Sequence, residues 1–270
     1  IYNLSYQGEK VIISKKLILI SFSLLITFCL SINSYAAGKN IDYPDQNWSF
    51  SGLFGTFDKA AAQRGFQVYR EVCSGCHGIR LVAFRNLSAL GYNEEELKAL
   101  ASQFEITDGP NDDGETYTRP GRPSDKFLSP YRNEQAARFA NGGAYPPDLS
   151  LIVKARPKGA DYLYSLLVGY NDPPKGLEIP EGMYFNTFYS GNFIAMPQPL
   201  YDGGVEYFDG TKATKDQMAR DVTTFLAWTS EPELENRKRL GFTVICFLLV
   251  FSILAYFSMK QIWSPIKRKI

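Results

Sequence analysis

The sequence is poor in histidine and cysteine, with one histidine and four cysteines among 270 residues. A structural zinc site normally takes four ligands from two Cys/His pairs, and this chain offers only one such group, so a zinc site is not expected. Cys29 and Cys246 lie in long apolar runs. Only Cys73 and Cys76 remain between those runs, so no structural disulfide is expected there even in an oxidising compartment.

Positive charge is scarce in the middle of the chain. Residues 38–236 hold 19 Lys and Arg against 27 Asp and Glu, a net charge of −8, while both ends are basic. Nucleic acid phosphates need positive charge, so nucleic acid is not an expected partner. The acids concentrate in one acidic stretch (residues 94–115), which favours a basic protein partner; a merely solvated acidic face is the alternative. Its acidic residues include Glu94, Glu95, Glu96, Asp108, Asp112, Asp113 and Glu115.

The N-terminal segment has the pattern of a secretory signal peptide. Three lysines precede an apolar run at residues 17–30, and small residues around Ala36 offer a cleavage site. We therefore expect residues 1–36 to be a signal peptide and residues 37–236 to form an exported domain. An uncleaved anchor is the alternative, because the uncharged stretch continues to Gly38.

A second apolar run, residues 240–259, contains no charged residue. A helix of that length, at about 1.5 Å per residue, crosses the roughly 30 Å hydrocarbon core of a bilayer. We expect a transmembrane anchor helix over residues 237–260 and a basic cytoplasmic tail over 261–270, with a buried core helix as the alternative. Residues Ser230 to Glu233 have the form of a capping box, which predicts a helix start about two turns before the bilayer.

The exported segment is long enough for one domain with its own core. Strand signals are weak and Pro- and Gly-rich loops separate the helical patterns, so the expected fold class is all-α with long ordered loops. The last helix is the clearest, since Thr214 and Gln217 form a capping box ahead of an apolar face that includes Met218 and Phe225. The predicted helices cover residues 58–77, 93–104, 133–140, 161–168 and 215–228.

The one histidine closes the motif Cys73-Ser74-Gly75-Cys76-His77 at the end of the first predicted helix. Two cysteines at this spacing share a helical face, and the histidine four residues after Cys73 lies on that face too. The two thiols can bond covalently to the vinyl groups of one porphyrin, and the imidazole can ligate its iron. The motif therefore predicts one covalently bound haem c, attached through Cys73 and Cys76 with His77 as an axial ligand.

A thioredoxin-like redox pair uses the same cysteine spacing. Such a pair lies at the start of a helix, where the N-terminus lowers the thiol pKa, whereas this motif ends a helix that Asp58 is predicted to cap. Chance occurrence is the other alternative. The lack of further cysteines and the exported position both favour the haem.

A haem iron needs either a second protein ligand or an open site. Met218 fits the apolar face of a helix and Met259 lies at the end of the anchor, so packing explains both. Met196 precedes Pro197 in a Pro-rich loop that could aim its thioether at the iron. Met183 could do the same less rigidly, so Met196 is favoured while Met183 remains open.

From Trp48 to the basic tail the chain resembles the cytochrome c1 family, the membrane-anchored haem subunits of cytochrome bc1 complexes. The haem motif is generic to c-type cytochromes, whereas the other matching stretches in this order are specific to the family. These stretches are residues 64–77, 108–115, 119–121, 141–150, 195–197, 230–232 and 237–239.

The resemblance implies a cytochrome c-like haem domain with Met196 as the second axial ligand. It also implies that Pro146 or Pro147 lies near the haem, where a main-chain carbonyl could accept the second N–H of the ligating imidazole. Haem propionates need cationic or hydrogen-bonding partners. The resemblance suggests Arg156 for this role, with Arg119 as a second possibility and ordinary surface charge as the alternative for both.

The function implied is a one-electron relay within quinol–cytochrome c reductase, with no catalytic residue and no enzyme activity of its own. A Rieske iron–sulfur protein, in a complex with cytochrome b, would reduce the haem, and a mobile or anchored c-type cytochrome would remove the electron. The expected location is the bacterial inner membrane, with the haem domain on the periplasmic side. The alternatives are a stand-alone anchored cytochrome serving an oxidase or reductase, and a haem enzyme with an open iron site.

Overall fold

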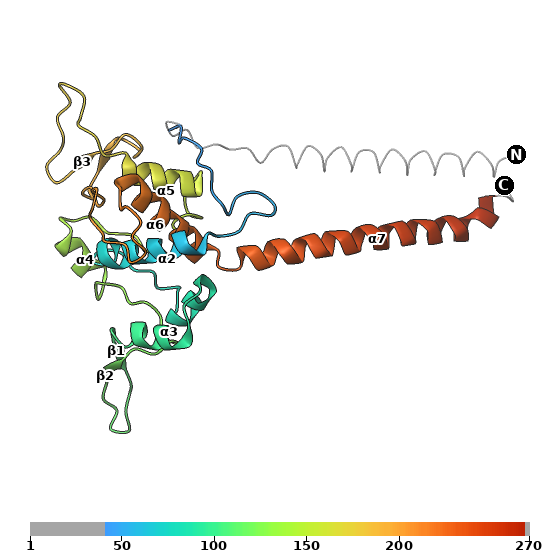
Figure 1. The fold of residues 1–270 in the computed structure, drawn as a ribbon, viewed down its shortest axis with the longest axis horizontal. Helices are drawn as coiled ribbons and strands as arrows, with labels where there is room; N and C mark the ends of the chain where they lie inside the picture. The colour runs from blue at the N-terminus through green and yellow to red at the C-terminus, as the bar shows by residue number, and fades with distance from the viewer. Residues whose placement is uncertain (1–40, 268–270) are drawn as a thin grey trace, which may run out of the picture. The chain divides into compact units, whose positions relative to one another are not determined.

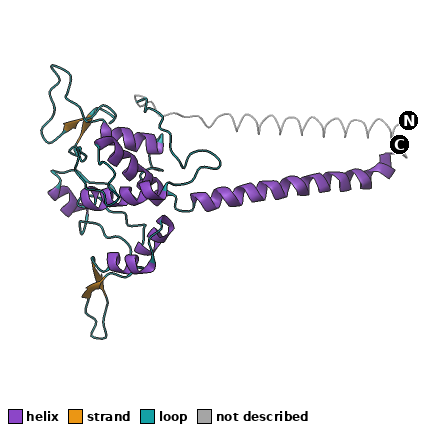
Figure 2. Cartoon of the chain, viewed as in Figure 1, coloured by secondary structure: helices purple, strands orange, loops and turns teal. Residues whose placement is uncertain are grey.

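The computed structural model describes residues 41–267, so the predicted signal peptide lies outside the described residues. The described segment is mostly helical (Figures 1 and 2), as the sequence predicted. Its elements in order are α2 (Lys59–Val68), the π-helical turn η1 (Tyr69–Cys73), the 3-10 helix η2 (Phe84–Leu90), α3 (Glu94–Ala101), β1 (Glu105–Asp108), β2 (Tyr117–Pro120), α4 (Glu134–Ala140), α5 (Gly159–Val168), β3 (Tyr184–Phe185), β4 (Phe193–Ile194), α6 (Lys215–Ser230) and α7 (Leu234–Lys267).

All five helices predicted for the domain are present, and side-chain caps explain where four of them begin. Asp58, Asn93, Asn133 and Thr214 each accept the main-chain N–H three residues ahead, which satisfies one of the unpaired donors at a helix start. The first helix is shorter than predicted, because regular α-helix stops at Val68 and the chain continues as η1.

Helices α2 and α6 lie side by side and form the centre of the core (Figure 1). Gly65 permits their close approach, since a Cβ atom at that position would lie 2.0 Å from the main-chain oxygen of Asp221. Phe66 and Phe225 are buried in the same contact, with their ring centroids 5.4 Å apart. Met218 is fully buried there, which confirms that it packs in the core.

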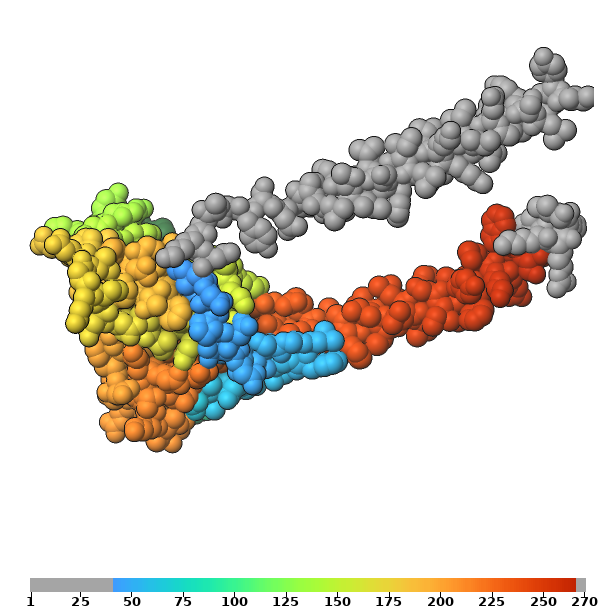
Figure 3. Space-filling model, turned by 90° about the horizontal axis from the view of Figure 1, so that it is seen from above, coloured from blue at the N-terminus to red at the C-terminus, as the bar shows by residue number. Residues whose placement is uncertain are grey.

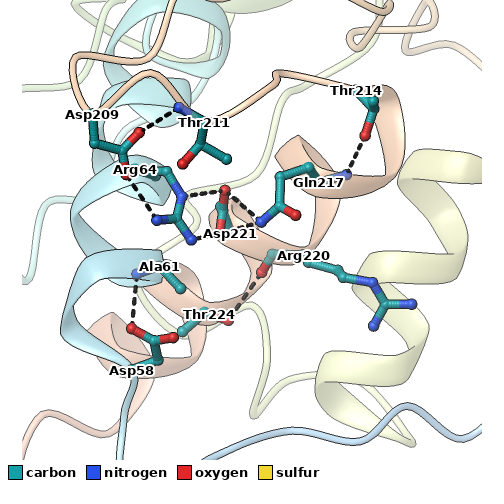
Figure 4. A network of polar contacts seen from close by, with 10 residues as sticks. All are labelled: Asp58, Ala61, Arg64, Asp209, Thr211, Thr214, Gln217, Arg220, Asp221 and Thr224. Atoms are coloured by element: carbon teal, nitrogen blue, oxygen red, sulfur yellow. Dashed lines mark hydrogen bonds and ion pairs between the residues drawn. The ribbon is translucent and has the colours of Figure 1, made fainter.

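An ion pair joins the same two helices (Figure 4). Arg64 on α2 donates from Nε and Nη2 to the two carboxylate oxygens of Asp221 on α6, over 2.9 and 3.1 Å. The side chain of Asp221 is only 1 % exposed. Removing Arg64 alone would leave a buried, unpaired carboxylate, a change that typically costs about 3–5 kcal/mol. The position of α2, and of the motif at its end, therefore depends on this pair.

The predicted capping box at the start of α6 is correct for one of its two bonds. Thr214 Oγ1 accepts the main-chain N–H of Gln217 over 3.1 Å. The Gln217 side chain does not turn back to the cap; it donates to both carboxylate oxygens of Asp221 instead, at 3.1 Å each (Figure 4). The buried carboxylate binds the amide N–H group of Gln217, and this turns the side chain away from the Thr214 N–H that it would accept in a complete capping box.

Two short antiparallel hairpins lie within the loops of this mostly helical fold. β1 pairs with β2, with Glu105 opposite Pro120, and β3 pairs with β4, with Tyr184 opposite Ile194. Both lie in segments that were expected to be ordered loops. Strands of two to four residues are too short to show an alternating pattern in the sequence.

Helix α7 is long and apolar enough to cross a membrane, and none of its most apolar window is buried in the protein. Its side chains are exposed along most of its length (Figure 3), which excludes the buried core helix considered above. The predicted capping box before it is wrong. Ser230 ends α6, and its hydroxyl donates to the main-chain oxygen of Leu226 over 2.8 Å, so the new helix begins at Leu234.

Candidate functional site

The cysteine motif begins where α2 widens into η1. The main-chain N–H of Ser74 donates to the oxygen of Tyr69 over 2.8 Å, five residues back, and π-turns of this kind occur frequently at functional sites. The chain then closes a tight turn, because Cys76 and His77 both donate to the main-chain oxygen of Cys73, over 3.1 and 2.9 Å. The continuous helix predicted to residue 77 is thus replaced by two turns that keep Cys73 and His77 one turn apart.

Both thiols of the motif are free. Cys73 is half-buried and Cys76 is exposed. Burial, with a smaller contribution from Cys76, raises the pKa of the Cys73 thiol to about 12. A thioredoxin-like pair needs a lowered thiol pKa at a helix N-terminus, whereas this pair follows the C-terminal end of a helix. The geometry therefore argues against a dithiol redox pair.

His77 is oriented through one side of its ring. Its Nδ1 lies 2.7 Å from the main-chain oxygen of Pro147. A carbonyl only accepts, so Nδ1 carries the proton and Nε2 presents a lone pair. Burial lowers the pKa of His77 and outweighs the Pro147 hydrogen bond and the Asp148 charge, which raise it. The neutral imidazole, the form that ligates metals, is therefore favoured, and Pro147 rather than Pro146 supplies the contact.

Three residues that the sequence analysis did not single out hold this loop in place. Asp148 accepts the main-chain N–H of Arg80 over 3.0 Å and its Nε–H over 3.1 Å. Although burial raises it, hydrogen bonds from Arg80 and Ser150 hold the pKa of Asp148 below its usual range. Ser150 Oγ accepts the N–H of Leu81 over 3.1 Å. The only signal in the sequence was the resemblance of residues 141–150 to the family.

The donor set fits a covalently attached haem. Within residues 41–267 the two thiols are free and Nε2 of the neutral imidazole has no hydrogen-bond partner, and these are the groups that a c-type haem requires. Leu81 and Leu151 adjoin the bonded segments and are exposed, and uncovered apolar side chains suit a large apolar group. Residues 41–267 contain no cluster of three or more His, Cys, Asp or Glu side chains placed to hold a metal ion.

Met196 lies in the loop after β4 and is fixed at its own main chain. The Tyr170 hydroxyl donates to the Met196 carbonyl oxygen over 3.0 Å, and the Met196 side chain is partly buried against the small cluster that Tyr170 and Ile194 belong to. Met183 lies just before β3 and is 40 % exposed. The better-held loop is that of Met196, which favours it over Met183.

The two arginines suggested for the haem propionates are placed differently. Arg119 on β2 is mostly buried and donates to the carboxylates of Asp108 and Asp125, so its guanidinium braces the β1–β2 hairpin. Arg156 is exposed, and the one hydrogen bond of its side chain within residues 41–267 goes to the main-chain oxygen of the preceding residue, over 3.3 Å. Arg156 is the freer cation of the two.

Comparison with known proteins gives a consistent result. A sequence model of the Cytochrome C1 family matches residues 48–266. The chain is 47 % identical over 245 residues to "Cytochrome c1 1, heme protein, mitochondrial" of Arabidopsis thaliana, covering 91 % of this chain and 80 % of the relative. It is 49 % identical over 235 residues to "Cytochrome b-c1 complex catalytic subunit, mitochondrial" of Candida albicans, covering 87 % and 82 %. It is 47 % identical over 281 residues to "Cytochrome b/c1" of Bradyrhizobium diazoefficiens, covering 96 % of this chain and 41 % of that protein.

Proposed function

The chain belongs to the cytochrome c1 family, and we propose that it carries single electrons through a covalent haem c as a subunit of quinol–cytochrome c reductase. Its relatives include a cytochrome b-c1 complex subunit and a cytochrome b/c1 protein, so cytochrome b is its partner. The chain is a redox subunit and not an enzyme by itself. One observation carries the assignment of the site: Pro147 holds Nδ1 of His77 and leaves Nε2 free beside two unbridged thiols.

In this proposal Cys73 and Cys76 would hold the haem through two thioether bonds, and His77 would ligate its iron through Nε2. When bound, the haem supplies a one-electron iron couple. The chain's part is to keep the imidazole neutral and aligned, which the Pro147 carbonyl does from the opposite side of the ring. Because a main-chain carbonyl cannot take up a proton, Nδ1–H would stay on the ring whatever the charge of the bound iron.

Met196 would be the second residue to ligate the iron. A thioether in that position raises the haem potential relative to histidine alone, because it favours ferrous iron. With both His77 and Met196 as ligands, the iron would have no open site for oxygen or peroxide, which would suit an electron carrier. The Tyr170 hydroxyl on the Met196 carbonyl supports this assignment, since it fixes the loop at the ligating residue.

We assign one haem propionate to Arg156. The exposed guanidinium has most of its N–H groups free within residues 41–267, and a carboxylate is the partner that its planar donors fit best. Arg119 is the weaker candidate, because Asp108 and Asp125 already occupy it.

The proposed electron donor is a Rieske iron–sulfur protein and the proposed acceptor is a mobile c-type cytochrome with a basic surface. The acidic stretch supports the second part. Glu94 is paired with Lys98 and Asp108 with Arg119, so the unpaired charge of the stretch is carried by other acids, notably those of the β1–β2 turn. In the described part of the chain Asp112, Asp113 and Glu115 are exposed and form no ion pair, and such charge steers a cationic partner.

Helix α7 anchors the chain in a membrane. We propose that residues 37–236 lie on the periplasmic side of a bacterial inner membrane, residues 237–260 cross it, and residues 261–270 reach the cytoplasm. The signal-like pattern of residues 1–36 supports this orientation.

The proposal is tested on protein purified from membranes in mild detergent. A pyridine haemochrome spectrum should show two thioether bonds, and the ferric haem should be low-spin and bind carbon monoxide or cyanide poorly. Cytochrome b and a Rieske protein should copurify. A low-spin haem without these companions would instead favour a stand-alone anchored cytochrome, and a high-spin haem that binds cyanide readily would exclude the Met196 ligation.

A further inference from the structure

A short loop near the start of the domain is closed by main-chain contacts. In this 49–57 loop the N–H of Thr56 donates to the oxygen of Ser49 over 3.0 Å. A Cβ atom on Gly55 would lie 1.9 Å from the oxygen of Ser51, so only glycine permits the tight return of the chain. The loop is thus preorganised and has a fixed outer edge.

That outer edge carries two large apolar side chains that the described chain leaves mostly exposed. Leu53 is 61 % exposed and Phe54 is 74 % exposed. A rigid loop gains nothing from presenting such residues to water, and neighbouring apolar side chains of this size typically mark a contact with a partner or a membrane.

The 49–57 loop lies against the first turns of α7 (Figure 3), and it is bound there at three places. Glu235 Oε1 accepts the main-chain N–H of Phe57 over 2.8 Å. Lys238 Nζ donates to two main-chain oxygens of the loop, over 2.8 and 3.0 Å. The rings of Phe54 and Phe242 meet edge to face, 5.8 Å apart. Positions 235, 238 and 242 lie on one face of a helix, so the loop runs down that face toward the apolar section.

The contact with Phe242 sets the level of the loop relative to the start of the uncharged run of α7. The uncharged run of α7 begins at residue 240, so Phe242 lies only about 3 Å inside it at 1.5 Å per residue. If α7 spans the membrane as proposed above, Leu53 and Phe54 reach the boundary between the headgroups and the hydrocarbon. Aromatic and apolar side chains are favoured at that level.

A cavity of about 350 Å³ lies between the loop and α7, and it is lined on one side by Leu53 and Phe54 and on the other by Lys238 and Arg239. Within residues 41–267 neither cation has a carboxylate partner. Arg239 Nη2 donates to Asn236 Oδ1 over 3.0 Å, and Lys238 donates only to main-chain oxygens. The cavity has the size of a small ligand site and an excess of positive charge.

We propose that this cavity binds the anionic headgroup of a membrane phospholipid, with Leu53 and Phe54 inserted beside its acyl chains. The order of the groups along the membrane normal matches that of such a lipid. The cations lie where α7 is still charged, at the level of the headgroup, and the apolar side chains lie where α7 becomes apolar, at the level of the acyl chains. Glu235 is the one carboxylate of the lining, and it is occupied by the Phe57 N–H. The site lies at the α7 junction and involves none of the haem residues, so it rests on the proposed membrane span alone.

Lipid titration of the haem-loaded full chain tests the headgroup. Delipidated protein in neutral detergent is titrated with phosphatidylglycerol and with phosphatidylcholine of the same chain length. The wild type should bind phosphatidylglycerol about fivefold more tightly, the effect of roughly one interfacial cation, and Arg239→Gln should remove this preference. Arg237→Gln is the matched control, since Arg237 is held by Glu231 over 2.7 Å and does not line the cavity. Equal affinities in the wild type, or equal losses in both variants, would overturn the site.

Depth is measured separately with a spin label on Phe54→Cys, in a chain that also carries Cys246→Ser, inserted into nanodiscs that contain phosphatidylglycerol. The label should be relaxed by oxygen, which concentrates in the apolar region, and little by a water-soluble nickel complex. A label on Phe139→Cys is the control, because Phe139 is 93 % exposed and lies on α4 in the domain. Strong relaxation by nickel at position 54, or shielding from both reagents in the assembled complex, would refute insertion. The haem spectrum of the same samples is an independent readout, so either proposal can fail without the other.

Discussion

The Nδ1 atom of His77 lies 2.7 Å from the main-chain oxygen of Pro147, seventy residues further along the chain. Because the acceptor is main chain, its position depends on the path of the loop and not on a rotamer. That path is fixed next to the contact, where Asp148 and Ser150 bond the loop to residues 80–81. The orientation of the proposed iron ligand is thus a property of two loops held together.

Asp148→Asn should loosen that arrangement. The variant loses charge-assisted hydrogen bonds from Arg80 at a partly buried site, which typically costs about 1–3 kcal/mol. We expect a lower midpoint of thermal unfolding and a broadened low-spin signal in the electron paramagnetic resonance spectrum of the ferric haem. Asp172→Asn, an exposed acid in the loop after α5, is the control and should change neither. A sharp, unshifted signal in Asp148→Asn would remove its positioning role.

Met196→Leu should retain the covalent haem and lower its potential. The choice of axial ligands moves haem potentials over roughly 0.8 V in total. The variant would lose the thioether and gain no protein ligand in its place, so its midpoint potential should fall by a large part of the difference between ligand types. Redox titration measures the shift in potential. Loss of the far-red absorption band that arises from the bond between a thioether and ferric iron would show that the lost ligand causes this shift. Met183→Leu should keep both the band and the potential; the reverse pattern would transfer the ligand role to Met183.

Arg64→Met should destabilise the haem domain without touching the haem motif. The buried Asp221 carboxylate would lose its partner at a cost of about 3–5 kcal/mol, which corresponds to a fall of roughly 6–20 °C in the unfolding midpoint for a domain of this size. Arg70→Met changes an exposed arginine on η1, just after α2, and should leave the midpoint nearly unchanged. Similar midpoints for the two variants would show that the ion pair does not stabilise the α2–α6 contact.

Acid should open the β1–β2 hairpin. The Arg119 guanidinium lowers the pKa of Asp125 to about 2 and also lowers the pKa of Asp108. Since the pKa of Asp125 in the folded protein lies below its unfolded value of about 3.9, the stabilisation is complete above about pH 4 and is lost as the pH falls toward 2. Hydrogen exchange of the hairpin amides, corrected for intrinsic rates, should rise over that interval. Asp112→Asn should keep this rise, whereas Asp125→Asn should already exchange fast at pH 5.

Charge reversal at Asp112 and Asp113 should slow reduction of a basic c-type cytochrome at low salt. Steering by such charges changes association rates by about tenfold or more, and it is screened when the Debye length falls from about 10 Å at 0.1 M salt to about 3 Å at 1 M. Stopped-flow rates across ionic strengths give the measurement. Reversal of Glu178 and Glu181 in the loop before β3 is the matched control. Identical salt dependence in both variants would leave the acidic stretch a solvated surface.

Features that depend on neighbouring residues could be predicted from the sequence. The caps at Asp58 and Thr214 and the apolar face of α6 involve side chains within one or two turns, so their patterns are directly visible in the sequence. The spacing of Cys73, Cys76 and His77 is equally local, and it encodes the chemistry of haem attachment in five residues. These predictions needed no knowledge of the tertiary fold.

Features that depend on competition between partners could not be predicted. Gln217 has a local donor at the cap, the N–H of Thr214, and a buried carboxylate acceptor one turn on, and only the packing of α2 against α6 decides between them. Ser230 bonds backward into α6 because the next helix starts later than its pattern suggested. The contact between His77 and Pro147 joins segments seventy residues apart, so no spacing in the sequence distinguishes Pro147 from Pro146.

The two hydrogen bonds from Lys238 to the 49–57 loop limit how the domain can rotate on α7. A head joined to its membrane helix by a single strand of chain can swivel about that joint. Here the chain meets α7 twice, once through the direct connection from α6 and once through residues 50–57, and two points of attachment block rotation. The domain therefore keeps a fixed orientation on its anchor helix. Any protein that delivers or collects an electron has to travel to it, so the range of the exchange is set by the motion of the partners.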